Sequence, residues 1–243
     1  MNFEPFFQPV EAIDHWLASL LDGAPLAVAL LIAFVLGLRH ASDPDHLIAV
    51  TSLVAADGGD TRRAAALGAW WGLGHGGTLL VVGLPLILLK SELPGWLELG
   101  AERAVGVVIL LLAVRVLWNW LRGDYRLDSH SQHLHPHVHR ASDVHSHHRA
   151  RSPRQAFGIG LLHGLAGTGA VVLLLIAALP SQIEAAAALL LFAPMSVVSM
   201  AGCTTAFAWT LTRPALEPVY RSVLIPGFGA FGLLFGTWYV GLI

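Results

Sequence analysis

Residues 37–50 read GLRHASDPDHLIAV and bring two imidazoles and two carboxylates into one short stretch. The imidazoles belong to His40 and His46, and the carboxylates to Asp43 and Asp45. Imidazole nitrogen binds transition-metal ions well, whereas Mg²⁺ and Ca²⁺ prefer oxygen ligands. Nearby carboxylates make the approach of a cation more favourable. The stretch therefore predicts a site for a divalent transition-metal ion. The adjacent Arg39 either pairs with one of the aspartates or extends its charged end towards water.

A proline in this stretch suggests how the side chains could meet. On a continuous helix His40, Asp43 and His46 are spaced i, i+3, i+6 and lie along one face. Asp45 would point elsewhere. Pro44 removes a backbone hydrogen bond and clashes with the carbonyl of His40, so it favours a break. A broken segment could direct two imidazoles and one or two carboxylates towards one ion.

Two further histidines stand in glycine-rich apolar segments. His75 lies in WWGLGHGGTLL and His163 in GIGLLHGLAGTGA. Glycine lets helices approach closely, so each imidazole is expected against a neighbouring backbone. Ionisable side chains are costly at membrane depth and usually face the interior of a bundle. We expect both histidines to join the first stretch as metal ligands; the alternative for each is a hydrogen-bonded structural histidine.

Eight of the 13 histidines fall between residues 130 and 148. They are His130, His133, His135, His137, His139, His145, His147 and His148. The segment has few apolar residues and is expected to be disordered without a ligand. Because neutral imidazoles bind several transition metals, we interpret it as an accessory, metal-collecting cytoplasmic loop of low specificity. A solvated linker or a purification tag is the alternative, although a tag would normally lie at a terminus.

The composition places this chemistry in a membrane. Of the 243 residues, 55% are hydrophobic and 12% are charged, whereas soluble chains carry about 25% charged residues. The apolar runs are continuous rather than alternating, which predicts helices. The expected fold class is therefore an all-α polytopic membrane protein with about six transmembrane helices, each of about 20 apolar residues. We place them at residues 25–45, 65–89, 101–121, 155–179, 185–211 and 219–242.

The charges between the spans predict their orientation. Arginines concentrate in three connections: Arg62, Arg63, Arg122, Arg126, Arg140, Arg149, Arg151, Arg154, Arg213 and Arg221. By the positive-inside rule these connections are cytoplasmic and both termini lie outside the cell membrane. We expect this membrane to be the inner cell membrane. Four regions follow. They are an interfacial N-terminal segment (1–23), a three-helix half (24–121), the His-rich loop (122–154) and a second three-helix half (155–243).

The two halves share a faint motif. GLRHA at 37–41 and GLLHG at 160–164 each place a histidine three residues after a glycine. The first span should run inward and the fourth outward. This pattern predicts an inverted 3+3 repeat, which is common in transporters that bind substrate near the membrane midplane. Chance similarity between helices rich in glycine and leucine is the alternative.

The motifs resemble those of the nickel/cobalt transporter (NiCoT/NicO) superfamily. RHASDPDH is similar to the family's HxxxxDH signature, usually RHAxDADH, and LGH at 73–75 is similar to its second element. The resemblance implies that His40, Asp45 and His46 fill the signature in a transmembrane helix, with Asp43 at the acidic position within it. The LGFDTATE motif of longer members is replaced by GLLHGLAGTGA. With six spans, the chain looks like the compact urease- or hydrogenase-accessory nickel permeases.

The resemblance implies transport of a divalent metal ion, Ni²⁺ first and Co²⁺ second, as substrate and with no permanent cofactor. The chain lacks the GxxxxGK[ST] fingerprint, so a gradient or a separate subunit would supply the energy. A proton gradient fits, since histidine binds metal only when neutral. The implied partners are the lipid bilayer and a cytoplasmic metallochaperone or urease or hydrogenase maturation proteins, and no nucleic acid. We expect that the protein is not an enzyme. The alternatives are a membrane metalloenzyme and a metal sensor or assembly partner.

A reporter fused at residue 135 should give a cytoplasmic signal, because the arginine-rich connections are expected inside. A pair of reporters active on opposite sides of the membrane measures this directly. An external signal at this position would contradict the orientation.

Overall fold

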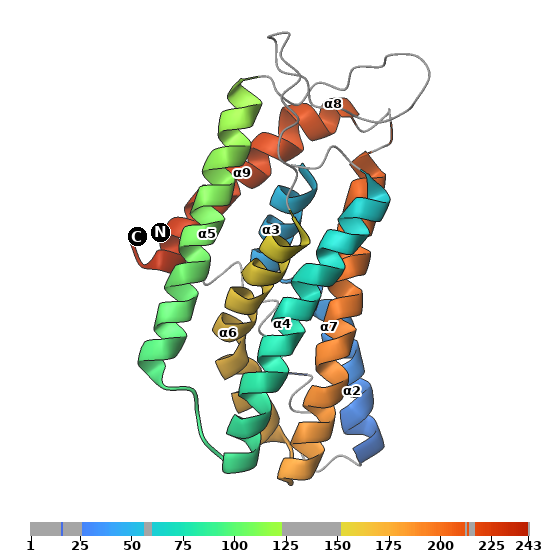
Figure 1. Cartoon of the computed structure of the whole chain (residues 1–243), viewed down its shortest axis with the longest axis vertical. Helices are drawn as coiled ribbons and strands as arrows, with labels where there is room; N and C mark the ends of the chain where they lie inside the picture. Colours follow the sequence, from blue (N-terminus) through green and yellow to red (C-terminus); the bar gives the residue numbers. More distant parts are fainter. Residues whose placement is uncertain are drawn as a thin grey trace.

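The computed structural model describes residues 16, 26–55, 60–122, 152–211, 213 and 217–242. Within these residues the chain forms helices and turns and no strand (Figure 1). The elements in chain order are α2 (Leu26–Arg39), η1 (His40–Ser42), α3 (Pro44–Ala55), α4 (Thr61–Leu89), α5 (Gly95–Leu121), α6 (Pro153–Ala178), α7 (Gln182–Leu211), α8 (Glu217–Val219), η2 (Tyr220–Leu224) and α9 (Ile225–Val240). The predicted N-terminal segment and His-rich loop lie outside the described residues, apart from the exposed Trp16 and the ends of the loop region.

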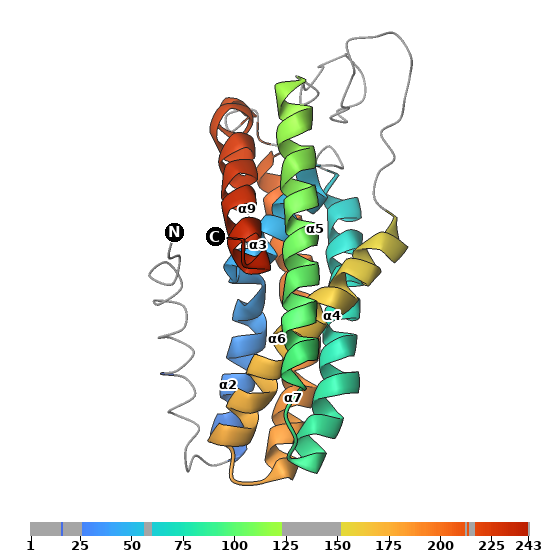
Figure 2. The same cartoon turned by 90° about the vertical axis from the view of Figure 1, so that its left-hand side faces the viewer.

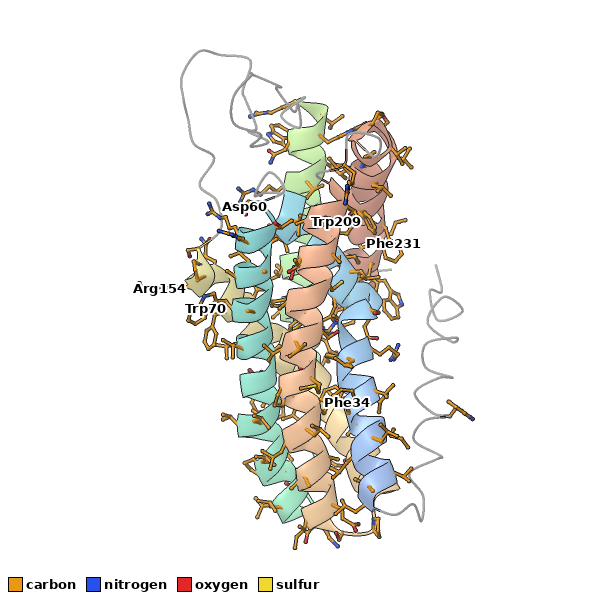
Figure 3. All side chains as sticks on the ribbon, turned by 90° about the vertical axis from the view of Figure 1, so that its right-hand side faces the viewer. Phe34, Asp60, Trp70, Arg154, Trp209 and Phe231 are labelled. Carbon is orange, nitrogen blue, oxygen red and sulfur yellow. The ribbon has the colours of Figure 1, made fainter. Side chains whose placement is uncertain are left out.

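The helices have the length and composition of membrane spans. Within the described part of the chain, four helical stretches qualify: Thr61–Leu89, Gly95–Leu121, Gln182–Thr210 and Ser222–Val240. Leu26–Ser42 is a shorter apolar helix, and α6 has 26 residues. Large apolar side chains project outward from the bundle along these helices, for example Phe34 and Trp70 (Figure 3). Such outward apolar faces suit a lipid environment, and the chain is an all-α polytopic membrane protein.

The first span differs from the single helix expected at 25–45, because it is interrupted and longer. Helix α2 ends at Arg39, a 3₁₀ turn follows, and Asp43 is extended at φ −64° and ψ 143°. Helix α3 then begins at Pro44 and continues to Ala55. A residue that precedes proline avoids the helical region, and proline itself suits the first position of a helix. The predicted break is thus confirmed, and it falls at Asp43.

The helices alternate in direction along the bundle (Figures 1 and 2). Helices α2, α5 and α7 run one way, while α4, α6 and α9 run the other. Helix α4 packs against both α6 and α7, α2 packs against α7, and α5 packs against α9. The helices can be matched in pairs: α2–α3 with α6, α4 with α7, and α5 with α9. The two members of each pair run in opposite directions, and each helix packs against the counterparts of its partner's neighbours. The arrangement agrees with the inverted 3+3 repeat that the shared motif predicted.

Glycines bring α4 and α6 into backbone contact. A Cβ added at Gly74 would lie 2.2 Å from the carbonyl oxygen of Phe157, and one added at Gly160 would lie 2.0 Å from that of Trp71. At Gly164 the added Cβ would lie 2.5 Å from the carbonyl oxygen of His75. These contacts leave no room for any larger residue. Their role is to hold the helix that carries His75 directly against the helix that carries His163.

Gly160→Ala should therefore lower the free energy of unfolding by about 1–3 kcal/mol, as overpacking does in a tight interface. Thermal unfolding of the purified protein in detergent measures the change. The matched control is Gly158→Ala on the same helix, where a Cβ would meet no atom within 4 Å. The control should keep or raise the stability, because alanine is the better helix former. Equal melting of the two variants would contradict the packing role.

Candidate metal centre

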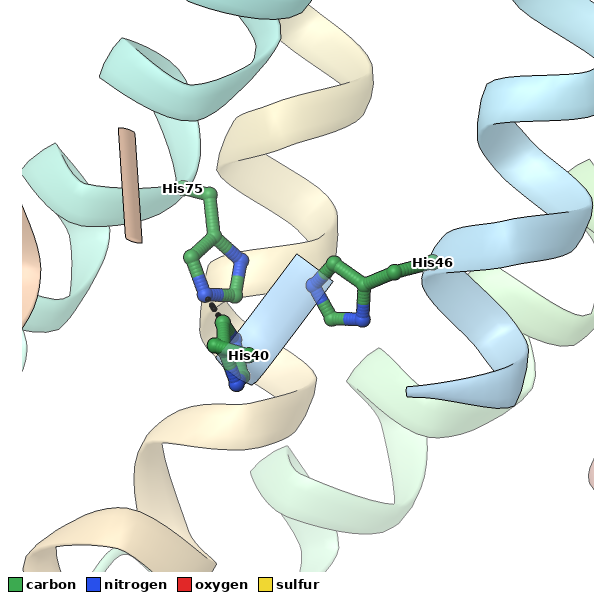
Figure 4. Close-up of side chains that lie close together, drawn as sticks. All are labelled: His40, His46 and His75. Carbon is green, nitrogen blue, oxygen red and sulfur yellow. Dashed lines mark hydrogen bonds between the residues drawn. The ribbon is translucent and has the colours of Figure 1, made fainter. Parts of the chain in front are cut away.

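Three histidines from three elements converge inside the bundle. His40 comes from η1, His46 from α3 and His75 from α4 (Figure 4). One ligand nitrogen from each can be chosen so that all lie within 4.8 Å of one another. Nε2 of His40 lies 2.8 Å from Nε2 of His75. The ring centroids of His40 and His46 are 4.5 Å apart, and those of His46 and His75 are 5.2 Å apart. All three side chains are buried.

A second group of ligand atoms shares His46 and extends the centre to α6. Asp45 Oδ1 lies 2.9 Å from Nδ1 of His46, and Asp45 Oδ2 lies 3.0 Å from Nε2 of His163. The ring centroids of His46 and His163 are 4.7 Å apart. One carboxylate thus contacts an imidazole from α3 and an imidazole from α6. The helix break makes this possible, since Asp45 would point away from the other ligands on a continuous helix.

Asp43 takes a different place in the centre. Its Oδ2 lies 3.1 Å from Nδ1 of His40, and its Oδ1 lies 3.3 Å from Nη1 of Arg39. Arg39 therefore pairs with Asp43, which decides between the two alternatives that the sequence left open. Asp43 belongs to neither three-ligand group. It contacts the ring edge of His40 opposite the nitrogen that meets His75, and so it orients this imidazole.

The hydrogen bonds assign the protons on these rings. A carboxylate accepts, so His40 donates its Nδ1–H to Asp43, and its Nε2 then accepts from the Nε2–H of His75 when both rings are neutral. In the same way His46 donates its Nδ1–H to Asp45. Carboxylates that hold ligand histidines in one tautomer are typical of metal sites.

This proton assignment leaves one lone pair on each of two rings. They are on Nδ1 of His75 and Nε2 of His46, and among the described residues neither nitrogen has a hydrogen-bond partner. Buried polar atoms are nearly always hydrogen-bonded, so two such atoms in one place require an explanation. Figure 4 shows the two rings turned towards each other beside His40. A cation held between them would use both lone pairs.

Aromatic side chains enclose the centre. Trp71 is fully buried on α4, with its ring centroid 5.3 Å from that of His46 and 5.8 Å from that of His163. Phe192 of α7 lies 5.2 Å from His40 by the same measure. The sequence interpretation gave Trp71 no role, although its position four residues before His75 puts it on the same helix face. These rings exclude water, which strengthens the attraction between a cation and its ligands.

The structure thus brings together all six side chains that the sequence singled out inside the membrane: His40, Asp43, Asp45, His46, His75 and His163. His163 contacts Asp45 and is buried, like the other three histidines. The eight histidines between residues 130 and 148 lie outside the described residues. The ligand types suit a borderline transition-metal ion, since imidazole nitrogen predominates and the carboxylates supply negative charge.

Comparison with known proteins identifies relatives over most of the chain. The "Urease accessory protein UreH" of Bacillus sp. (strain TB-90) is 28% identical over 222 residues, which cover 90% of this chain and 93% of that protein. The "High-affinity nickel transport protein" of Cupriavidus necator is 35% identical over 104 residues, or 42% of this chain and 29% of that protein. The "Cobalt transport protein NhlF" of Rhodococcus rhodochrous is 34% identical over 97 residues, which cover 37% of this chain and 27% of that protein. No solved structure matches.

The family model named NicO, "High-affinity nickel-transport protein", matches residues 26–172. This range is more than half of the chain and contains every residue of the buried centre. It confirms the resemblance that the motifs of the first two spans indicated. The chain therefore belongs to the NicO nickel-transport family.

Proposed function

We propose that this protein moves Ni²⁺, and also Co²⁺, across the membrane through the buried histidine–aspartate centre, with the ion as substrate. The observation that carries the proposal is the pair of unpartnered, buried nitrogens on His46 and His75 within a cluster of four imidazoles. Membership of a nickel-transport family supports it, as do the names of the nickel and cobalt transport relatives.

The ligand set supports a transition-metal substrate over other cations. A hydrated Ni²⁺ or Co²⁺ ion must exchange water for protein atoms on entering an apolar bundle. Imidazole nitrogens make this exchange favourable for borderline metals, but poor for Mg²⁺ and Ca²⁺. The first position would use His40, His46 and His75, and the second Asp45, His46 and His163. Because His46 belongs to both, an ion can pass between the two positions without losing all its protein ligands.

The family assignment favours transport over a membrane metalloenzyme or a metal sensor. A catalytic centre keeps its metal, whereas a transport centre must release it. The adjoining ligand groups come from both halves of the bundle, through α3, α4 and α6. In transporters built from inverted repeats, rocking of one half against the other alternately exposes such a midplane site. The same movement would separate Asp45 from His163 and weaken coordination.

We also propose that the end of the bundle where α4 and α6 begin faces the cytoplasm of a cell membrane. Arg62, Arg154 and Arg213 lie there, at the start of α4, the start of α6 and just after α7 (Figures 1 and 3). The guanidinium of Arg213 lies 4.0 Å from the ring centroid of Trp209. Tryptophan is enriched at membrane–water interfaces, and arginine on the cytoplasmic side. The His-rich loop would then collect metal inside the cell, where a metallochaperone or urease or hydrogenase maturation proteins are the proposed partners.

His46→Ala should reduce radioactive Ni²⁺ flux in proteoliposomes at least about tenfold, because both ligand groups lose their shared member. The variant must reach the membrane in normal amount, which immunoblotting of membrane fractions checks. His15→Ala, which changes a histidine that is not among the predicted ligands, serves as the control and should transport like the parent protein. Parental flux in His46→Ala would refute the assignment of the site.

Deletion of residues 128–150 should change the apparent affinity for Ni²⁺ while leaving flux measurable, because the loop is proposed to gather metal and not to conduct it. Flux measured over a range of Ni²⁺ concentrations separates the two effects. Complete loss of flux, in a variant that inserts normally, would show that the loop is part of the transport path.

A further inference from the structure

Ser199 of α7 contacts the helix break that carries His40. Its hydroxyl donates to the carbonyl oxygen of Leu38 at 2.5 Å, near the end of α2. The hydroxyl oxygen of Ser199 also accepts a hydrogen bond from the backbone N–H of Ala41, in η1, at 3.3 Å. A hydroxyl has one donor and two acceptor lone pairs, so it can make both bonds at once. The two contacts lie on either side of residues 39 and 40.

The other hydroxyls of α7 behave differently. Ser196 donates to the carbonyl oxygen of Ala193 at 2.7 Å, and Thr205 donates to that of Ala201 at 2.6 Å. Thr204 and Thr210 also bond carbonyls of α7 itself. Within the described part of the chain, Ser199 is thus the hydroxyl of α7 that bonds a neighbouring element.

Close packing of α2 on α7 makes this contact possible. A Cβ added at Gly37 would lie 2.7 Å from both Met195 Cβ and the carbonyl oxygen of Phe192. The absence of a side chain at Gly37 therefore lets α2 approach α7 one turn before Ser199. Backbone groups disturbed by a break have no water to bond inside a membrane, so they need partners from the protein. Ser199 supplies such partners from the second half of the chain.

We propose that Ser199 is a positioning residue for metal binding, which fixes the turn from α2 to η1 and thereby places His40 against His46 and His75. The inference rests on the proposed function. Both of these hydrogen bonds join Ser199 to backbone atoms and not to the ligand side chains. It acts through the backbone, because the residues that it bonds, Leu38 and Ala41, enclose His40. The break therefore depends on a hydroxyl from the other half as well as on Pro44.

Two measurements on the full-length protein in detergent test this role. The first is amide hydrogen exchange of the segment 36–43 without metal, because Ala41 loses its hydrogen-bond acceptor in Ser199→Ala. The second is titration with Co²⁺, whose absorption spectrum reports ligand number and geometry. The matched control is Ser196→Ala. Ser196 lies one turn earlier on α7, and its hydroxyl bonds a carbonyl of α7 itself. Ser199→Thr retains the hydroxyl and is the conservative rescue.

Ser199→Ala should exchange faster over 36–43 and bind Co²⁺ about tenfold more weakly, with an altered spectrum. Ser199→Thr should restore both readouts, and Ser196→Ala should leave both unchanged. Unchanged exchange in Ser199→Ala would overturn the contact, and faster exchange with parental Co²⁺ binding would overturn the positioning role. Failure of the parent protein to bind Co²⁺ would instead refute the proposed function, and the exchange comparison would still decide whether Ser199 holds the break.

Discussion

Polar groups inside this apolar bundle have no water to bond, so an atom without a partner in the protein is costly unless a ligand binds it. This constraint governs the centre. Asp43 is paired by Arg39 and His40, and Asp45 is paired by His46 and His163. Each carboxylate accepts a hydrogen bond from a ring N–H and so determines which imidazole nitrogen stays unprotonated. The result is a site whose lone pairs are directed before any ion arrives, which lowers the cost of binding.

Close packing of the backbones of α4 and α6 holds His75 and His163 in place. Gly74, Gly160 and Gly164 allow α4 and α6 to touch along their main chains. Thr78 reinforces the contact, since its hydroxyl can bond the carbonyls of Gly74 and Leu161, each at 3.1 Å. Two helices from different halves are thereby fixed at the depth of the centre. This packing explains why His75 and His163, which lie far apart in the chain, have ring centroids only 6.5 Å apart.

The break in the first span shows which features of this structure local sequence rules can predict. Pro44 and the extended residue before it are local effects, so the interruption could be predicted from sequence. Its consequences could not. On a regular helix Asp43 shares a face with His40 and His46, yet the structure turns Asp43 towards Arg39 and gives Asp45 the contact with His163. The length of the span was also underestimated, since α3 continues to Ala55.

The sequence by itself determined the membrane class, the helical fold and the family resemblance, and it singled out the candidate ligands. It could do so because hydropathy, proline sterics and ligand chemistry depend only on residue type and short spacing. Only the tertiary structure decided which carboxylate holds which imidazole, that Trp71 encloses the site and that Ser199 bonds the break. Those contacts join residues up to 161 positions apart. They follow from how helices pack, which no local pattern specifies.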